Sequence, residues 1–138
     1  MTTTFVTRTE DETSAAGEQF AARLQGGDVV LLHGDLGAGK TAFVRGVARG
    51  LGAPGDDVSS PTFTIIQEYR GRVTLHHVDL YRLAPAEVDD LGLDELAESG
   101  GVVAIEWAER WIDAPEGAWV IRIALEGEAD RRIVIEPG

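Results

Sequence analysis

The sequence predicts an α/β fold in which a mixed β-sheet is flanked by helices and ends in a C-terminal β-hairpin. Residues 28–33 and 102–107 are continuous apolar runs, the pattern of strands that are covered on both faces. The first run leads into a Gly-rich turn and then into an amphipathic helical pattern. Near the C-terminus, residues 120–125 and 131–135 alternate apolar and polar side chains around a turn at 127–130, which is typical of a half-exposed hairpin.

Length and composition indicate one globular domain spanning residues 1–138. Hydrophobic residues make up 43% of the chain and charged residues 26%, which argues against a disordered or fibrous protein. No apolar run approaches the roughly 18 residues of a membrane span, and the N-terminus has no apolar segment typical of secretory signals. The absence of cysteine excludes disulfides, cysteine zinc sites and thiol nucleophiles. We therefore expect a soluble, cytoplasmic protein without membrane contact.

The first helix is expected over residues 9–24, because Thr9 and Glu12 fit a capping box. A second helix is expected over residues 40–51, directly after the Gly-rich turn. The other expected elements are β segments at 62–69 and 73–79, joined by a hairpin turn, and short helices at 85–90 and 94–98.

Residues 34–41 read GDLGAGKT and match the phosphate-binding P-loop pattern G-x-x-x-x-G-K-[ST]. The glycines allow successive N–H groups to turn toward a phosphate, and the following helix directs the positive end of its dipole to the same place. Lys40, the only lysine in the chain, can reach the β- and γ-phosphates, and the Thr41 hydroxyl can bind Mg²⁺. A chance match has a probability of about one in several hundred. The sequence therefore predicts a P-loop NTPase-like fold.

A P-loop also needs a carboxylate at the end of a buried strand to hold Mg²⁺. Glu106 follows the run VVAI and has the form of a Walker B acid, with Glu in place of the more common Asp. Asp79 ends the less apolar segment TLHHV. We interpret Glu106 as a Mg²⁺-linked carboxylate and Asp79 as a second metal-shell or water-orienting carboxylate. Which of the two is the direct ligand stays open, and either acid alone also fits an exposed residue or a helix cap.

Three further features each have two interpretations. Thr62, in the hydroxyl-rich loop SSPTFT, either senses the γ-phosphate and Mg²⁺ or serves ordinary turn chemistry. Trp107 either packs in the core or covers the nucleotide. His76 and His77 are neighbours on a predicted strand, so they point to opposite faces and do not easily ligate one metal.

The net charge of the chain indicates which classes of partner it can bind. The chain carries 24 acidic and 12 basic residues, a net charge of −12. A protein that grips a nucleic-acid backbone usually has a basic face, so we expect no DNA binding. A local basic patch could be built only from scattered arginines, and the acidity itself favours solubility.

Four segments in this order, HGDLGAGKT, SSPTFTIIQEY, HHVDLYRL and IEW, closely resemble the TsaE (YjeE) family of bacterial P-loop ATPases. The resemblance covers the chain from Thr9 to the terminal hairpin. It implies an Mg²⁺-dependent ATPase accessory to the N6-threonylcarbamoyladenosine (t6A) modification of tRNA. It also implies docking on a heterodimer of TsaD and TsaB, with tRNA contacted only indirectly. TsaD is expected to carry the threonylcarbamoyl transfer.

The resemblance also implies a set of site residues. The expected cofactors are ATP or ADP and Mg²⁺. The expected catalytic residues are Lys40, Asp79 and Glu106. The expected metal-binding residues are Thr41, Glu106 and Asp79. The nucleotide-binding set is Glu10, Asp11, Asp35, Leu36, Gly37, Ala38, Gly39, Lys40, Thr41, Thr62, Trp107 and Arg131. Some members place a basic residue after the hairpin glycine, whereas Glu128 follows Gly127 here. Arg131 or Arg132 is the substitute that we expect.

Two other functions compete with this one. A small-molecule kinase also begins with strand, P-loop and helix, but it usually has an Arg-rich lid, and the arginines after Gly100 are few and scattered. The second competitor is a non-catalytic interaction module that changes shape when a nucleotide binds. Such a module would not need the P-loop residues and the strand-end carboxylates together. No arginine finger is assignable within the chain; Arg82 is a candidate, and a partner is the other source.

Overall fold

The structure is a computed structural model that describes residues 2–35, 39–54 and 66–138. Its strands are β1 (Thr3–Thr7), β2 (Val29–His33), β3 (Ile66–Tyr69), β4 (Leu75–Asp79), β5 (Val102–Glu106), β6 (Trp119–Glu126) and β7 (Asp130–Glu136). Its helices are α1 (Glu10–Ala21), α2 (Lys40–Gly50), α3 (Pro85–Asp89) and α4 (Leu93–Glu98), with a 3₁₀ turn η2 (Ala108–Arg110).

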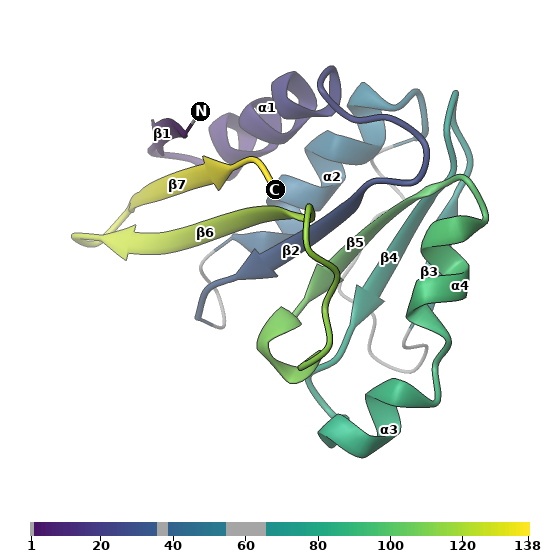
Figure 1. The fold of residues 1–138 in the computed structure, drawn as a ribbon. Helices are drawn as coiled ribbons and strands as arrows, with labels where there is room; N and C mark the ends of the chain where they lie inside the picture. The colour runs from purple at the N-terminus through teal and green to yellow at the C-terminus, as the bar shows by residue number, and fades with distance from the viewer. Residues whose placement is uncertain (1, 36–38, 55–65) are drawn as a thin grey trace.

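The described strands form one mixed sheet of seven strands in the order β1-β7-β6-β2-β5-β4-β3. The central pairs β6–β2, β2–β5 and β5–β4 are parallel. The outer pairs β4–β3, β6–β7 and β7–β1 are antiparallel. Helices α1 and α2 lie on one face of the sheet, and α3 and α4 lie on the other (Figure 1). The predicted α/β fold with a mixed sheet and a C-terminal hairpin is confirmed.

Strands β2 and β5 are apolar up to their last residue because each one contributes to two cores. Val30 and Leu32 of β2 pack in the cluster beneath α1 and α2, whereas Val29 and Leu31 pack in the cluster beneath α3 and α4. Strand β5 divides its residues between the same two clusters. The alternation of side chains along a strand thus assigns every position to one face. It also decides which strand-end side chains face α2.

Helix α1 begins as predicted and ends earlier. The Thr9 hydroxyl accepts a hydrogen bond from the Glu12 N–H at 3.1 Å, but the Glu12 carboxylate accepts from the Arg8 N–H instead of closing a box on Thr9. The helix packs closely on α2: a Cβ on Gly46 would lie 1.7 Å from the carbonyl oxygen of Ser14. Only glycine allows this approach, which packs the first half of α1 against the middle of α2.

Strand β1 is the element that sequence reasoning missed. It pairs antiparallel with β7, from Thr3 opposite Ile135 to Thr7 opposite Arg131. Thr4 and Val6 are exposed, so the segment shows little apolar periodicity. Its pairing covers the outer edge of the hairpin and brings Thr7 to the level of the hairpin turn.

Other boundaries shift modestly. The predicted strand over 62–69 is observed as β3 at 66–69, and residues 62–65 lie outside the described part. Strand β4 begins at Leu75, two residues after the predicted start. The two short helices are confirmed as α3 and α4. In the described part of the chain, no helix is long and apolar enough to cross a membrane.

Candidate nucleotide and magnesium site

The parallel strands bring the predicted site residues to one edge of the sheet. Strand β2 runs into the P-loop segment, β4 ends at Asp79 and β5 ends at Glu106. Asp79 and Glu106 are direct register partners. Helix α2 begins at Lys40, so the last two residues of the P-loop pattern form its first turn. This is the edge at which open α/β sheets bind their ligands, outside the carboxyl ends of the strands.

Two oxygen ligands of the kind that Mg²⁺ prefers meet at this edge. The Thr41 hydroxyl donates to Glu106 Oε2 at 3.5 Å, and Glu106 is only 3% exposed. Among the residues that the structure describes, no group of three His, Asp or Glu side chains is arranged to hold a metal. Mg²⁺ usually takes one or two carboxylates, several waters and substrate phosphates instead of an all-protein cage. Thr41 and Glu106 therefore fit Mg²⁺ that is held together with a nucleotide.

The Lys40 side chain folds back over the start of the P-loop. Its Nζ donates to the carbonyl oxygen of Gly34 at 2.6 Å and lies 4.0 Å from the centre of the Trp107 ring. The side chain is 4% exposed. Gly39, just before it, has φ of 106°, a conformation that favours glycine. The ammonium is thus buried between the Gly34 carbonyl, at the start of the P-loop pattern, and the Trp107 ring.

Trp107 is half-buried, packs against the core beneath α3 and α4, and also reaches the site. Its φ of 58° makes it the only non-glycine residue with positive φ in the described ranges. Its ring contacts the Tyr81 ring, with centroids 4.9 Å apart, as well as the Lys40 ammonium. Backbone conformations of this kind cost about 1–3 kcal/mol and cluster at functional sites. Trp107 thus contacts both a core and the Lys40 ammonium, and its role as an aromatic cover over the nucleotide stays a prediction.

Asp79 is half-buried at the end of β4, where its Oδ1 accepts from the Tyr81 N–H at 2.9 Å. Burial raises the pKa of the Asp79 carboxyl above its ordinary value, and the neighbouring Glu106 carboxylate raises it further. The Tyr81 N–H lowers the pKa and offsets part of this. The ionised form of Asp79 is therefore less favourable here than it would be in water.

The sequence that folds into this site matches the model of a known protein family. The family model described as "Threonylcarbamoyl adenosine biosynthesis protein TsaE" covers residues 7–133. This chain belongs to the TsaE family.

Relatives with the same name are similar over most of their length. The "tRNA threonylcarbamoyladenosine biosynthesis protein TsaE" of Treponema pallidum is 41% identical over 132 residues, which cover 94% of this chain and 97% of that protein. The protein of that name from Bacillus subtilis is 46% identical over 125 residues, covering 89% of this chain and 78% of the relative. The crystal structure of YdiB from Bacillus subtilis superposes with a TM-score of 0.82 at 37% identity, over 99% of this chain and 86% of that one. The similarity to TsaE proteins thus spans the fold from β1 to the hairpin.

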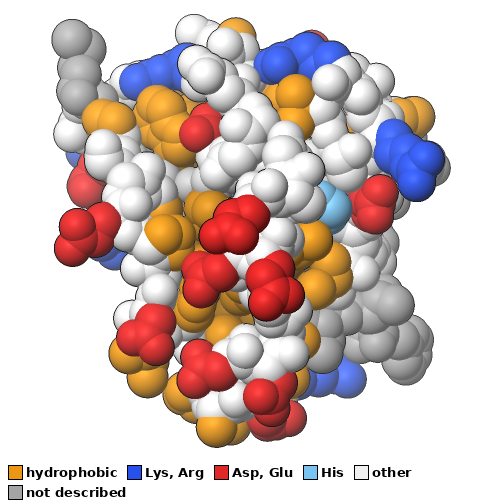
Figure 2. Space-filling model, turned by 45° about the vertical axis from the view of Figure 1, so that its right-hand side comes forward, with side chains coloured by type: hydrophobic (Ala, Val, Ile, Leu, Met, Phe, Trp, Pro, Cys, Tyr) orange, Lys and Arg blue, Asp and Glu red, His pale blue; other side chains and the backbone are white. Residues whose placement is uncertain are grey.

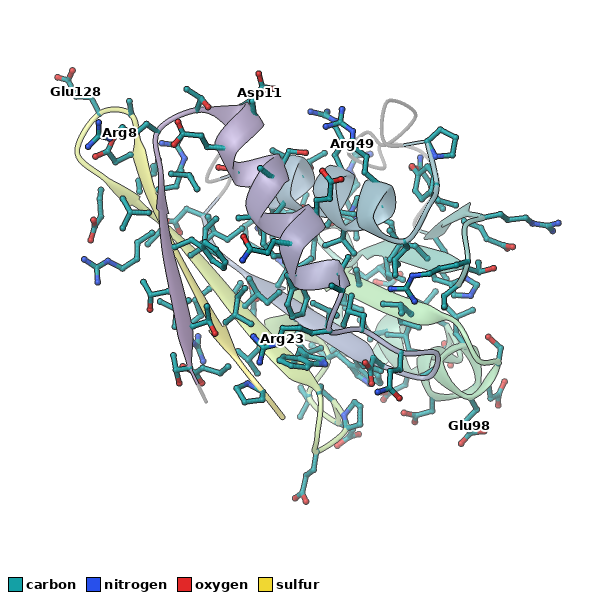
Figure 3. The ribbon with its side chains drawn as sticks, turned by 90° about the horizontal axis from the view of Figure 1, so that it is seen from above. Arg8, Asp11, Arg23, Arg49, Glu98 and Glu128 are labelled. Carbon is teal, nitrogen blue, oxygen red and sulfur yellow. The ribbon has the colours of Figure 1, made fainter. Side chains whose placement is uncertain are left out.

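Of the remaining predicted contacts, the structure of this TsaE-family chain describes Glu10 and Asp11 on α1, Asp35, and Arg131 on the hairpin. Glu10 and Asp11 form the exposed first turn of α1, and a Cβ on Gly39 would lie 3.5 Å from the Thr13 methyl group. Asp11 lies on the same side of the molecule as Glu128, with Glu98 on the opposite side (Figure 3).

On the hairpin, the two expected arginines are engaged differently. Arg131 donates through Nη1 to the carbonyl oxygens of Ala129 and Asp130, at 2.9 and 3.3 Å. Arg132 pairs with Glu126, with Nε and Oε1 2.6 Å apart. Leu36, Gly37, Ala38 and Thr62 lie outside the described residues, and Asp35 is exposed.

Sequence reasoning missed one residue at this site. His77 is fully buried and its Nε2 contacts Glu106 Oε2. His76, its neighbour, faces the other side, where a Cβ on Gly101 would meet its ring, so the expected opposite orientation is confirmed. The signal was the spacing: His77 precedes Asp79 by two residues, which puts both on one face of a strand.

The raised pKa of Asp79 predicts a gain in stability for Asp79→Asn. A raised pKa means that the folded state favours the protonated acid. The protonated Asp79 carboxyl therefore stabilises the fold fully at pH values below 3.8, the ordinary pKa of the group. This stabilisation is lost as the pH rises through the higher pKa of Asp79 in the folded state. Asparagine stays neutral and its amide oxygen can still accept from Tyr81.

In metal-free and nucleotide-free buffer we expect Asp79→Asn to raise the urea midpoint at pH 7, with the gain shrinking toward pH 4. Unfolding curves of both proteins across this range are the measurement. A variant less stable than the parent at pH 7 would contradict the burial argument.

Proposed function

We propose that this TsaE-family protein is an Mg²⁺-dependent ATP hydrolase accessory to the t6A modification of tRNA. The observation that carries the proposal is the meeting of the Lys40 ammonium, the Thr41 hydroxyl and the Glu106 carboxylate at the P-loop edge of the sheet. The names of the relatives, which are tRNA threonylcarbamoyladenosine biosynthesis proteins, support the pathway.

The chain's own residues would act mainly through position and charge, as in other phosphoryl transfers. Lys40 would leave the Gly34 carbonyl and bind the β- and γ-phosphate oxygens. Thr41 and Glu106 would hold Mg²⁺, which supplies positive charge to the phosphates when bound. Trp107, already stacked beside Lys40, would exclude water from one side of the phosphates.

Asp79 is better suited to orient the attacking water than to ligate Mg²⁺. The Tyr81 N–H donates to Oδ1 and fixes the orientation of the Asp79 carboxylate at the end of β4. A general base works best when its pKa lies near the operating pH, and the raised pKa of Asp79 moves it in that direction. This supports a role for Asp79 in the transition state.

The surface supports action through protein partners. Figure 2 shows acidic side chains gathered on the face that carries α3 and α4, with little positive charge among them. The exposed acids of these helices and their junction are Glu87, Asp89, Asp90, Asp94, Glu95 and Glu98. Such a face repels a phosphate backbone. We therefore propose that the protein docks on the TsaD–TsaB heterodimer and meets tRNA only through it.

Two experiments separate this function from its competitors. Transfer of the γ-phosphate to a small acceptor, in place of release to water, would identify a kinase. Complex assembly and repeated rounds of modification that proceed equally with ATP and with a non-hydrolysable analogue would identify a nucleotide switch without catalysis. We expect phosphate release to water, and repeated rounds only with ATP.

Glu106→Gln tests the metal role. The amide is nearly isosteric and keeps an oxygen for the His77 and Thr41 contacts, so the fold should persist. Loss of the negative charge should abolish Mg²⁺-dependent turnover, which a titration of turnover against Mg²⁺ concentration measures. Glu109→Gln is the matched control, because Glu109 is an exposed acid nearby that pairs with His33 at 3.3 Å. An unchanged Mg²⁺ dependence in Glu106→Gln would move the role to Asp79.

A further inference from the structure

His77 is a buried polar side chain at the site without an assigned role. It is 0% exposed and lies in β4, two residues before Asp79. Burying an imidazole is costly unless it is hydrogen-bonded, and apolar residues would fill the same space more cheaply. Leu75, on the same face of β4, does pack in the core beneath α1 and α2. The histidine therefore calls for an explanation other than packing.

The contacts of the ring define its protonation. Nε2 meets Glu106 Oε2, the same oxygen that the Thr41 hydroxyl reaches at 3.5 Å. An ionised carboxylate only accepts hydrogen bonds, so Nε2 must carry a proton. Nδ1 is buried and has no hydrogen-bond partner among the described residues. Nε2 is therefore the ring nitrogen that is placed to donate to Glu106.

The strand register explains why His77 can do this. Asp79 lies opposite Glu106, and His77 lies opposite Ala104, on the same face of the two strands. The side chain of His77 thus approaches Glu106 from β4, while Thr41 approaches it from α2. The carboxylate is held from two elements.

We propose that His77 is a positioning residue, whose Nε2–H fixes the orientation of the Glu106 carboxylate for Mg²⁺–nucleotide binding. This inference rests on the proposed function. Partners of metal-binding side chains act in this way in other proteins, and their loss typically costs about 10- to 100-fold in metal affinity. His77 itself touches neither metal nor nucleotide in this role.

Three variants distinguish positioning from packing. His77→Gln keeps an N–H at nearly the place of Nε2, His77→Asn moves the N–H to the place of Nδ1, and His77→Met fills the space without a donor. The measurement is the affinity for a non-hydrolysable ATP analogue, by calorimetry, in Mg²⁺ and in EDTA. We expect His77→Met and His77→Asn to lose about 10-fold or more of the affinity in Mg²⁺ with little change in EDTA, and His77→Gln to stay near the parent.

The unmodified chain supplies a second readout that needs no variant to fold. The ¹⁵N chemical shifts of the His77 ring, in metal-free and nucleotide-free buffer, should report a proton on Nε2. A ring protonated at Nδ1 alone would overturn the proposal.

The failures of the two proposals are separable. If the parent binds the analogue equally in Mg²⁺ and EDTA, the proposed metal-dependent function fails, and the role of His77 fails with it. If the parent is Mg²⁺-dependent and His77→Met is equally so, only the positioning role is overturned.

Discussion

Lys40→Ala should abolish ATP hydrolysis and strongly weaken ATP binding. Its ammonium is the only lysine charge in the chain and is held over the P-loop by the Gly34 carbonyl and the Trp107 ring. Losing it removes the group best placed to neutralise the β- and γ-phosphates. The loss of turnover should be at least about 100-fold, the effect of removing one donor aimed at transition-state charge.

Arg49→Ala is the matched control for Lys40→Ala. It removes a positive charge from the last turn of the same helix, where Arg49 contacts the Ser14 hydroxyl at 3.3 Å. Turnover and ATP affinity, measured on both purified variants, should fall only for Lys40→Ala. Near-normal turnover in Lys40→Ala would show that the P-loop is not the active site.

Asp79→Asn should leave Mg²⁺–ATP binding nearly intact while turnover falls by orders of magnitude. If Asp79 orients water, only the transition state uses that contact, so the loss appears in kcat and not in affinity. We expect the defect to be largest in the presence of TsaB and TsaD, because Asp79 lies beside a chain turn that partner docking could shift. Single-turnover kinetics and binding, with and without the partners, measure the two effects.

Asp90→Asn, an exposed acid that follows α3, is the control for the change of charge. Equal losses of affinity and turnover in Asp79→Asn, with or without partners, would instead mean that Asp79 ligates the metal. In that case, the predicted gain in stability of Asp79→Asn would reflect the removal of a carboxylate that is placed to bind the metal and not to orient water.

The predictable part of the fold is the part that local pattern determines. Strands β2 and β5 are legible because burial on both faces demands unbroken apolar runs. The strand-end acids Asp79 and Glu106 are legible for a related reason, since parallel strands end at one edge. The P-loop is a local motif, and its place between β2 and α2 follows from the flanking patterns.

The missed features depend on contacts between distant segments. Strand β1 is held by its pairing with β7, and its own side chains are mostly exposed or half-buried. The positive φ of Trp107 is stabilised by tertiary contacts with Lys40 and Tyr81. The contact of His77 with Glu106 requires the register between β4 and β5, which no pattern within either strand reveals.

The most direct test of the proposed ATPase function is nucleotide turnover by the purified chain with Mg²⁺ and ATP. Turnover is measured first without and then with TsaB and TsaD. The convergence of Lys40, Thr41 and Glu106 predicts slow Mg²⁺-dependent release of phosphate by the chain alone. It also predicts a marked rise when both partners are added, lost again in Lys40→Ala. No phosphate release in either condition, although the chain is folded and the partners are bound, would contradict the proposal that this protein is an ATPase.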